Sequence, residues 1–367
     1  MKKILIGTTA LLAAATTVPA AQASEPVKLS LGGFYEYWVA GAKQDSGISA
    51  NNFDIQGEGE VYFAGSTVLD NGMNIGVMVQ LEAGIDNNDD DTIDESYLYV
   101  SGKLGKVILG STDNVAYLMR ATAPNAAYTE VDDTAIPDYL LNPGFADNIT
   151  DMGFDGDANK FIYMSPKLYG LQAGVSFTPS NNAGGDDNWS GVTNSENIGK
   201  AVNFDEAWAA SVSYERDLGP VGMLATAGYT VAQGAGNVAG DSGKAEDWAF
   251  GLNLTYQGFT LGGAYRGVSA NSDSGFSDYD GYAWDAGLMY AEGPYAVSLN
   301  YRKSKTEGEL GNGSNTIDTY AVGAKYTLGA GVDLWGQLAY ADYDATDTGL
   351  VDNKGAYGGV VGIHLDF

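Results

Sequence analysis

The sequence predicts an all-β fold, a 16-stranded antiparallel transmembrane β-barrel. Three observations lead to this expectation: an N-terminal export signal, side chains that alternate with a period of two, and connections that alternate between short turns and long polar loops. The chain has 367 residues, which is enough for one large β architecture. Beyond the N-terminal stretch no segment approaches ~18 consecutive apolar residues, which argues against a transmembrane helix in the mature chain.

The first 23 residues differ in composition from the rest of the chain. Lys2 and Lys3 precede an apolar, alanine-rich stretch that ends near Pro19, and small residues follow at positions 21 and 23. This pattern predicts a cleaved secretory signal peptide at residues 1–23 and a mature barrel at residues 24–367. A membrane anchor is the alternative, but the apolar stretch is short and is interrupted by threonines.

Alternation of side chains identifies the strands. Gln56, Glu58 and Glu60 alternate with small or apolar residues, and the residues from Trp248 to Tyr256 alternate in the same way. A period of two places the two sets on opposite faces of a strand. The expected strands lie near 28–40, 52–65, 72–84, 92–103, 105–112, 159–166, 169–178, 206–218, 220–233, 246–257, 258–269, 280–291, 294–306, 316–328, 331–344 and 355–367.

The connections between these strands fall into two classes. Seven are tight turns, and the eight between them are longer loops rich in Asp, Asn and Gly. This asymmetry is typical of transmembrane β-barrels. In such a barrel the apolar alternates face lipid, and aromatic residues at strand ends, such as Trp248, Tyr256, Tyr295 and Tyr326, lie at the level of the headgroups. The polar alternates then face a lumen that is too wide for side chains to fill.

Composition excludes several kinds of chemistry. The chain has no cysteine, which rules out a thiolate nucleophile, a disulfide and a cysteine-based metal centre. Its formal net charge is -29, so binding to nucleic acid is not expected. An outer-membrane hydrolase would depend on the single histidine, His364, as its base, and we therefore do not expect an enzyme.

Short motifs at 27–33 (VKLSLGG), 102–110 (GKLGKVILG), 163–166 (YMSP) and 170–177 (GLQAGVSF) precede a terminal Phe367. In this order they resemble the general porins of Gram-negative outer membranes, particularly the alphaproteobacterial type. The resemblance implies a water-filled channel in the cell outer membrane for passive diffusion of small hydrophilic solutes and ions. A substrate-specific channel and a non-conducting structural barrel are the alternatives.

The resemblance also implies partners and a constriction. It implies a homotrimer of complete barrels, contact with outer-membrane lipid and lipopolysaccharide, and recognition of Phe367 by the barrel-insertion machinery. It further implies that the third long connection, residues 111–158, folds into the barrel and narrows it. This connection holds Arg120, and its expected acidic side consists of Glu130, Asp132, Asp133 and Asp138.

The polar alternates give the candidate pore-lining residues. They are Glu36, Gln56, Glu58, Glu60, Gln80, Glu82, Glu95, Lys160, Arg266, Arg302 and Lys325. The first four strands supply mainly carboxylates, which predicts a channel that prefers cations. The resemblance implies arginines on the wall opposite the loop. At the position of the sixth-strand arginine this sequence has Ile162, and Lys160 takes the place of that arginine only partly. The alternative is that bound calcium or nearby Lys and Arg already neutralise the acids.

A cluster of acids in the second long connection is a candidate calcium site. Asp86, Asp89, Asp90 and Asp91 offer the oxygen ligands that calcium prefers. No glycine occupies the sharp-turn position of an EF-hand loop, so a solvated acidic loop is the alternative. No other cofactor is expected.

Overall fold

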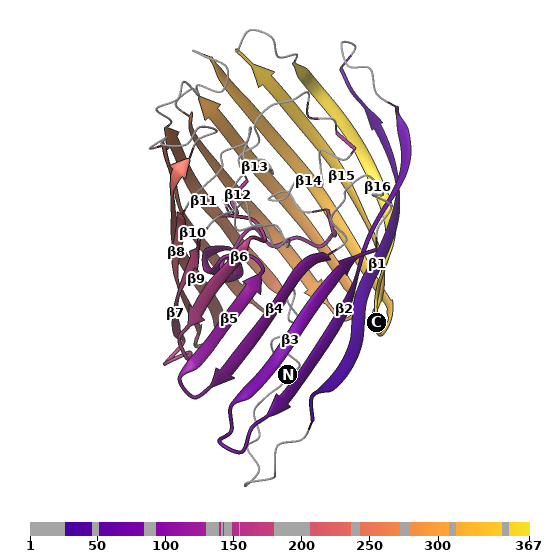
Figure 1. Ribbon diagram of the computed structural model, residues 1–367. Coiled ribbons are helices and arrows are strands. Elements are labelled where there is room, and N and C mark those ends of the chain that lie inside the picture. The colour runs from indigo at the N-terminus through magenta and orange to yellow at the C-terminus, as the bar shows by residue number, and fades with distance from the viewer. Residues whose placement is uncertain are drawn as a thin grey trace.

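Sixteen antiparallel strands close into one barrel (Figure 1). Each strand pairs with its neighbours in sequence, and β1 pairs with β16 to complete the ring. The structure, a computed structural model, describes residues 26–45, 51–83, 93–129, 139–140, 142, 149–153, 155–179, 206–235, 243–271, 279–307, 313–346 and 352–367. The predicted fold class is confirmed, and each strand end lies within about three residues of its expected position.

The strand bounds show the alternation of short and long connections. The strands are β1 (Lys28–Lys43), β2 (Phe53–Val68), β3 (Asn74–Glu82), β4 (Ile93–Gly102), β5 (Gly105–Ser111), β6 (Asn159–Met164), β7 (Leu171–Thr178), β8 (Glu206–Leu218), β9 (Val221–Ala235), β10 (Gly243–Tyr256), β11 (Phe259–Asn271), β12 (Tyr279–Glu292), β13 (Tyr295–Glu307), β14 (Ser314–Gly329), β15 (Val332–Ala345) and β16 (Asn353–Asp366). One short helix, α1 (Val115–Leu118), lies in the connection between β5 and β6. Among the described residues, no helix is long and apolar enough to cross a membrane.

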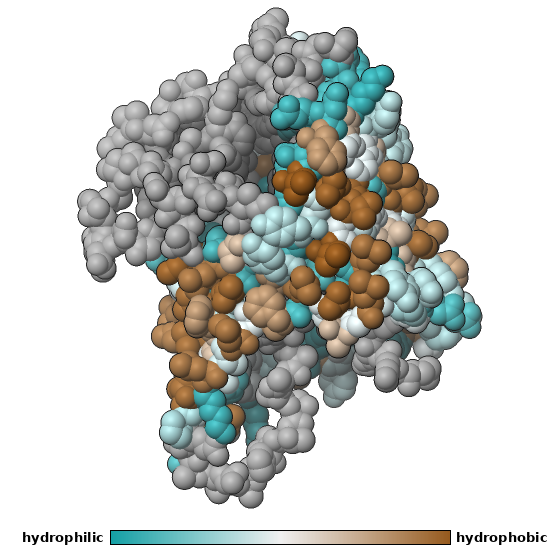
Figure 2. Space-filling view, turned by 90° about the vertical axis from the view of Figure 1, so that its right-hand side faces the viewer, coloured by the Kyte–Doolittle hydropathy of each residue, from teal (hydrophilic) through white to brown (hydrophobic). Residues whose placement is uncertain are grey.

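Exposed and buried side chains alternate along the strands, as expected for a wall that has lipid on its outer side. In β13, for example, Val297 and Leu299 are exposed, whereas Ser298 and Asn300 are buried. On the face shown in Figure 2, apolar side chains cover much of the wall, and hydrophilic residues lie above them. Apolar groups outside and polar groups inside are the reverse of a soluble fold, and they match a wall whose outer solvent is hydrocarbon.

The tight turns use backbone conformations that suit a twisted hairpin. Gln257 and Gly258 alone connect β10 to β11, and their φ angles are 48° and 85°. Positive φ at both central positions is the mark of a type I′ turn, whose twist matches that of the two strands. Turns of two residues also join β4 to β5, β8 to β9, β12 to β13 and β14 to β15.

The barrel closes through the last residue of the chain. The backbone N–H of Gly33 donates to the carbonyl of Phe367 at 3.0 Å, and the N–H of Phe367 donates to the carbonyl of Gly33 at 3.0 Å. A Cβ atom on Gly33 would lie 2.1 Å from the carbonyl oxygen of Glu60. Glycine is therefore required here, because β2 approaches the closing strand pair too closely for any side chain.

Candidate functional site

The connection between β5 and β6, residues 112–158, contacts the inward face of distant strands. The N–H of Ala123 donates to Asp285 Oδ1 on β12 at 2.9 Å. On β13, Ser298 Oγ accepts from the N–H of Ala126 at 3.0 Å, and Asn300 Nδ2 donates to the carbonyl of Pro124 at 2.8 Å. The described stretch 112–129 therefore runs across the barrel interior (Figure 1).

A second set of contacts ties this connection to β15. Gln337 is 3% exposed, and its Oε1 accepts from Thr129 Oγ1 at 2.9 Å and from the Tyr139 hydroxyl at 2.7 Å. Its Nε2 also donates to the carbonyl of Thr129 at 2.6 Å. Nearby, the Tyr343 hydroxyl donates to the carbonyl of Leu140 at 2.7 Å. One glutamine thus satisfies three polar groups of the connection.

The two ends of the connection are held together beside β7. Asn114 caps α1, and its Oδ1 accepts from the N–H groups of Ala116 and Tyr117 at 2.8 and 3.1 Å. Its Nδ2 donates to Asp155 Oδ1 at 2.7 Å and to the carbonyl of Met152 at 2.8 Å. An N-cap amide that also bridges to residues about forty positions later fixes both ends of the segment in one place.

Three of the basic residues expected along the pore have buried side chains. Lys160 is 3% exposed, and its Nζ donates to the carbonyls of Gly156, at 2.6 Å, and of Thr112. Arg266 pairs with Asp247, with 2.8 Å between Nε and Oδ2. Arg302 is 1% exposed. Because these side chains are covered, their charges would contribute less to an open lumen than the sequence leads us to expect.

The other two basic residues retain contact with solvent. Lys325 has a quarter of its side chain exposed and lies 3.2 Å from Asp333 Oδ2. Arg120, in the connection, pairs with Asp151, and its guanidinium carbon lies 3.5 Å from the centroid of the Tyr117 ring. Each of these cations therefore has an acidic neighbour within the barrel.

Carboxylates gather at the loop ends of β3 and β4, beside the middle of β2 and in the connection. One oxygen each of Glu60, Glu82 and Asp94 lies within 4.8 Å of the other two. A second group of three, from Glu95, Asp113 and Asp157, meets the same limit. Oxygen ligands grouped in this way are the kind that hold Ca²⁺ or Mg²⁺. The grouping of these acids was not predicted from the sequence, although the pairing of β2 with β3 places Glu60 opposite Glu82.

The acids of the second group perturb one another. The pKa of Asp157 is raised to about 7, first by burial and then by the charges of Asp94 and Glu95, while Lys160 opposes this rise. Burial also raises the pKa of Asp113 well above its usual range, with Asp157 and Glu95 adding to the effect. Glu95 itself accepts hydrogen bonds from Thr112 Oγ1 at 2.7 Å, from the N–H of Asp113 at 3.2 Å and from Gln80.

Some of the remaining predicted residues have contacts in the structure, and the others lie outside the residues that it describes. Glu36 is 5% exposed and contacts His364, with 2.9 Å between Oε2 and Nδ1. Gln56 lies near Asp54, and Glu58 lies opposite Glu36 in the pairing of β1 with β2. Outside the described residues lie the signal peptide (1–23), the predicted calcium ligands Asp86, Asp89, Asp90 and Asp91, and the loop acids Glu130, Asp132, Asp133 and Asp138.

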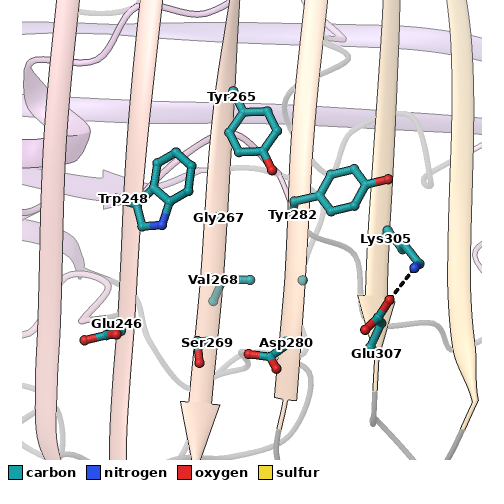
Figure 3. Close-up of a pocket in the computed structure, with 11 residues that line it drawn as sticks. Glu246, Trp248, Tyr265, Gly267, Val268, Ser269, Asp280, Tyr282, Lys305 and Glu307 are labelled. Carbon is teal, nitrogen blue, oxygen red and sulfur yellow. Dashed lines mark hydrogen bonds and ion pairs between the residues drawn. The ribbon is translucent and has the colours of Figure 1, made fainter.

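A hollow of about 300 Å³ opens on the outward side of β10 to β13. Trp248, Tyr265 and Tyr282 line it together with Gly267, whose missing side chain lets the Trp248 ring lie close to the strand (Figure 3). Lys305 and Glu307 form an ion pair at one edge (Figure 3). Because this hollow faces away from the interior, it is a feature of the lipid-facing wall and not of the lumen.

Comparisons with known proteins agree with this geometry. A family profile described as Gram-negative porin matches residues 7–346. An uncharacterized protein of Rickettsia bellii (strain RML369-C) is 23% identical over 422 residues, which cover 93% of each chain.

Two solved structures share the fold. The anion-selective porin from Comamonas acidovorans has a TM-score of 0.65 at 18% identity and covers 93% of this chain and 100% of its own. The trimer form of OmpT, an in-vitro folded outer membrane protein of Vibrio cholerae, has a TM-score of 0.62 at 11% identity and covers 94% and 100%. At these identities the likeness concerns the fold alone.

Proposed function

Because the chain belongs to the Gram-negative porin family, we propose that it passes small hydrophilic solutes and ions by passive diffusion and that it prefers cations. The family and the closed barrel indicate an outer-membrane channel. One observation carries the preference for cations. Six carboxylates form two groups of three at one side of the barrel interior, and in each group the oxygens lie within 4.8 Å of one another.

The negative charges of these carboxylate groups are the physical reason for the proposed preference for cations. Two unit negative charges ~4 Å apart repel by about 4 kcal/mol at an effective dielectric constant of ~20. Mobile cations relieve this repulsion and are therefore concentrated near the wall, whereas anions are repelled. The opposing charges are muted, because Lys160 is buried and Arg266 is paired with Asp247. Salt screens the field, so the preference should weaken as ionic strength rises.

The porin from Comamonas acidovorans provides a contrast in ion selectivity. That porin is described as anion-selective, although it shares the fold. Selectivity in a channel depends on the charged side chains along the path, and one fold carries many sites. The acids Glu60, Glu82 and Asp94 therefore support a selectivity opposite to that of a structural neighbour.

Reversal potentials test the proposal. Purified protein in a planar bilayer should give a potential of the sign for K⁺ over Cl⁻ in a tenfold KCl gradient. The variant Glu60→Gln/Glu82→Gln/Asp94→Asn should shift that potential toward zero. The matched control is Glu292→Gln, which removes one acid on the outward face beside Tyr290. Anion selectivity of the natural protein, or a triple variant indistinguishable from it, would contradict the proposal.

The remaining properties belong to the same proposal. We infer that residues 111–158 narrow the channel, supported by the contacts of residues 112–129 with β12, β13 and β15. We also infer cleavage after residue 23, contact with lipid and lipopolysaccharide, insertion guided by Phe367, and a homotrimer of complete barrels. A trimer form is recorded for the Vibrio cholerae neighbour. Native mass measurement in mild detergent tests the trimer, and a uniform monomer would count against it.

A further inference from the structure

The only histidine of the sequence lies on the inward side of β16 with a carboxylate at each ring nitrogen. His364 Nδ1 is 2.9 Å from Glu36 Oε2, and Nε2 is 3.1 Å from Asp366 Oδ1. An ionised carboxylate only accepts hydrogen bonds, and a neutral imidazole donates from one nitrogen only. Both contacts are hydrogen bonds only when both nitrogens carry a proton, so this geometry fits the imidazolium form.

The ring of His364 also stacks with two aromatic rings. One is Phe34 of β1, with 5.5 Å between centroids and an interplanar angle of 13°. Tyr128 lies 3.9 Å from the histidine ring centroid at 7°. Tyr128 belongs to the connection between β5 and β6, so this stack joins that connection to the wall. A cation over an aromatic face gains an attraction that a neutral ring lacks.

Further contacts hold Tyr128 in register with His364. Its hydroxyl donates to Asp333 Oδ2 at 2.7 Å, and Asp333 lies opposite His364 in the pairing of β15 with β16. The Lys325 ammonium of β14 lies 5.0 Å from the centroid of the Tyr128 ring. The charged or titratable groups around this site are Glu36 of β1, Glu58 and Glu60 of β2 opposite Glu36 and Phe34, Lys325 of β14, Asp333 of β15, Asp366 of β16 and Tyr128 of the connection.

The attachments on either side of Tyr128, at Ala126 and Thr129, do not depend on a titratable group. Ala126 bonds to Ser298, and Thr129 bonds to Gln337. The stack on His364 is therefore the attachment in this stretch that changes with the protonation of histidine. Loss of the ring proton would remove one donor to a carboxylate and the cation under Tyr128 at the same time.

We propose that His364 is a proton-dependent anchor for the connection: as imidazolium it holds Tyr128 against the wall, and its deprotonation weakens this contact of Tyr128 and changes the width of the lumen. This inference rests on the proposed channel function for its effect on conduction. The anchor itself has a readout that does not require conduction, because a single histidine gives one unambiguous set of ring signals.

The first test is nitrogen NMR of protein labelled with ¹⁵N-histidine, refolded in detergent micelles. At pH 6 both ring nitrogens should carry protons, and one titration should follow as the pH rises to 10. In Tyr128→Leu the ring signals should shift, because the stacked ring is gone, whereas Tyr128→Phe keeps the stack and should leave them nearly unchanged. A neutral imidazole at pH 6, or signals that are identical in all three proteins, would overturn the proposal.

The second test is single-channel conductance over the same range of pH. The natural protein should show a change in conductance at the pH where the histidine signals titrate. His364→Gln and Tyr128→Leu should lose this change, and Tyr128→Phe should keep it. If His364→Gln retains the change, another group causes it and the anchor does not control the lumen. If no protein conducts, the channel proposal fails, while the NMR comparison still decides whether Tyr128 packs on an imidazolium.

Discussion

Removal of the Gln337 side chain should weaken the attachment of the connection to β15. Gln337→Ala eliminates three hydrogen bonds of 2.6–2.9 Å, two to Thr129 and one to the Tyr139 hydroxyl. All three lie in a buried site. These bonds involve only the side chain, and the backbone pairing of Gln337 with β14 and β16 is unchanged by the substitution, so the barrel wall should stay intact.

The size of the effect follows from these bonds. A hydrogen bond contributes about 1 kcal/mol net, and orphaned buried partners cost more, so the attachment should lose at least ~3 kcal/mol. Because each 1.4 kcal/mol is tenfold in an equilibrium constant, the detached population should rise about a hundredfold. Gln337→Glu keeps the two acceptor contacts but replaces the donor to the Thr129 carbonyl with a carboxylate oxygen, so it should also weaken the attachment.

Single-channel conductance of the reconstituted protein is the assay. Gln337→Ala should give larger or more variable conductance steps than the natural protein, and swelling of liposomes should admit larger sugars. The matched control is Gln172→Ala on β7, whose amide donates to the carbonyl of Ser165 in a turn and not to the connection. Equal conductance of folded Gln337→Ala and Gln172→Ala would refute the reasoning.

Three further outcomes are expected. The pKa of Asp157 is raised to about 7, so its negative charge is present above that pH and lost below it. The preference for cations, measured by reversal potential, should therefore fall as the pH is lowered from 8 to 5, and Asp157→Asn should flatten this dependence. Gly105 has a φ of 113°, and a Cβ there would lie 2.2 Å from the carbonyl oxygen of Met164; Gly105→Val should therefore lower the free energy of unfolding by at least about 1–3 kcal/mol in a urea titration, and an unchanged midpoint would contradict this. Deleting Phe367 removes the backbone pair with Gly33 and should reduce the amount of barrel in the outer membrane far more than the conductance of surviving channels, as quantified in membrane fractions.

The strands could be predicted because their signal is local. Alternation along Trp248 to Tyr256 is fixed by the two solvents on either side of one strand, and it needs no knowledge of the rest of the chain. The same period separates Glu36, Arg266 and Arg302 from their exposed neighbours, and all three are buried in the structure. A two-residue turn such as Gln257–Gly258 fixes the register of its hairpin in the same local way.

The contacts inside the barrel could not be predicted from such a signal. Tyr128 and His364 are 236 positions apart in the chain, and no period or turn relates one to the other. The burial of Lys160 is of the same kind, because it depends on where Thr112 and Gly156 lie and not on the alternation of β6. The groups of acids could be predicted only in part. The register of β2 with β3 places Glu60 beside Glu82, but the path of the connection brings Asp157 to Glu95.

The distant partners of the connection have a consequence for the order of folding. Residues 123–129 bond to Asp285, Ser298 and Gln337, which follow them in the chain by 162 to 208 positions. Such contacts carry a large loop-closure entropy and slow a folding reaction. The connection can reach its place only after β12 to β15 have formed, so an inserting barrel must pass through a stage whose wall is nearly complete and whose interior is still open. A chain stalled at that stage would admit larger solutes than the finished barrel, because residues 123–129 would not yet lie against β12 to β15.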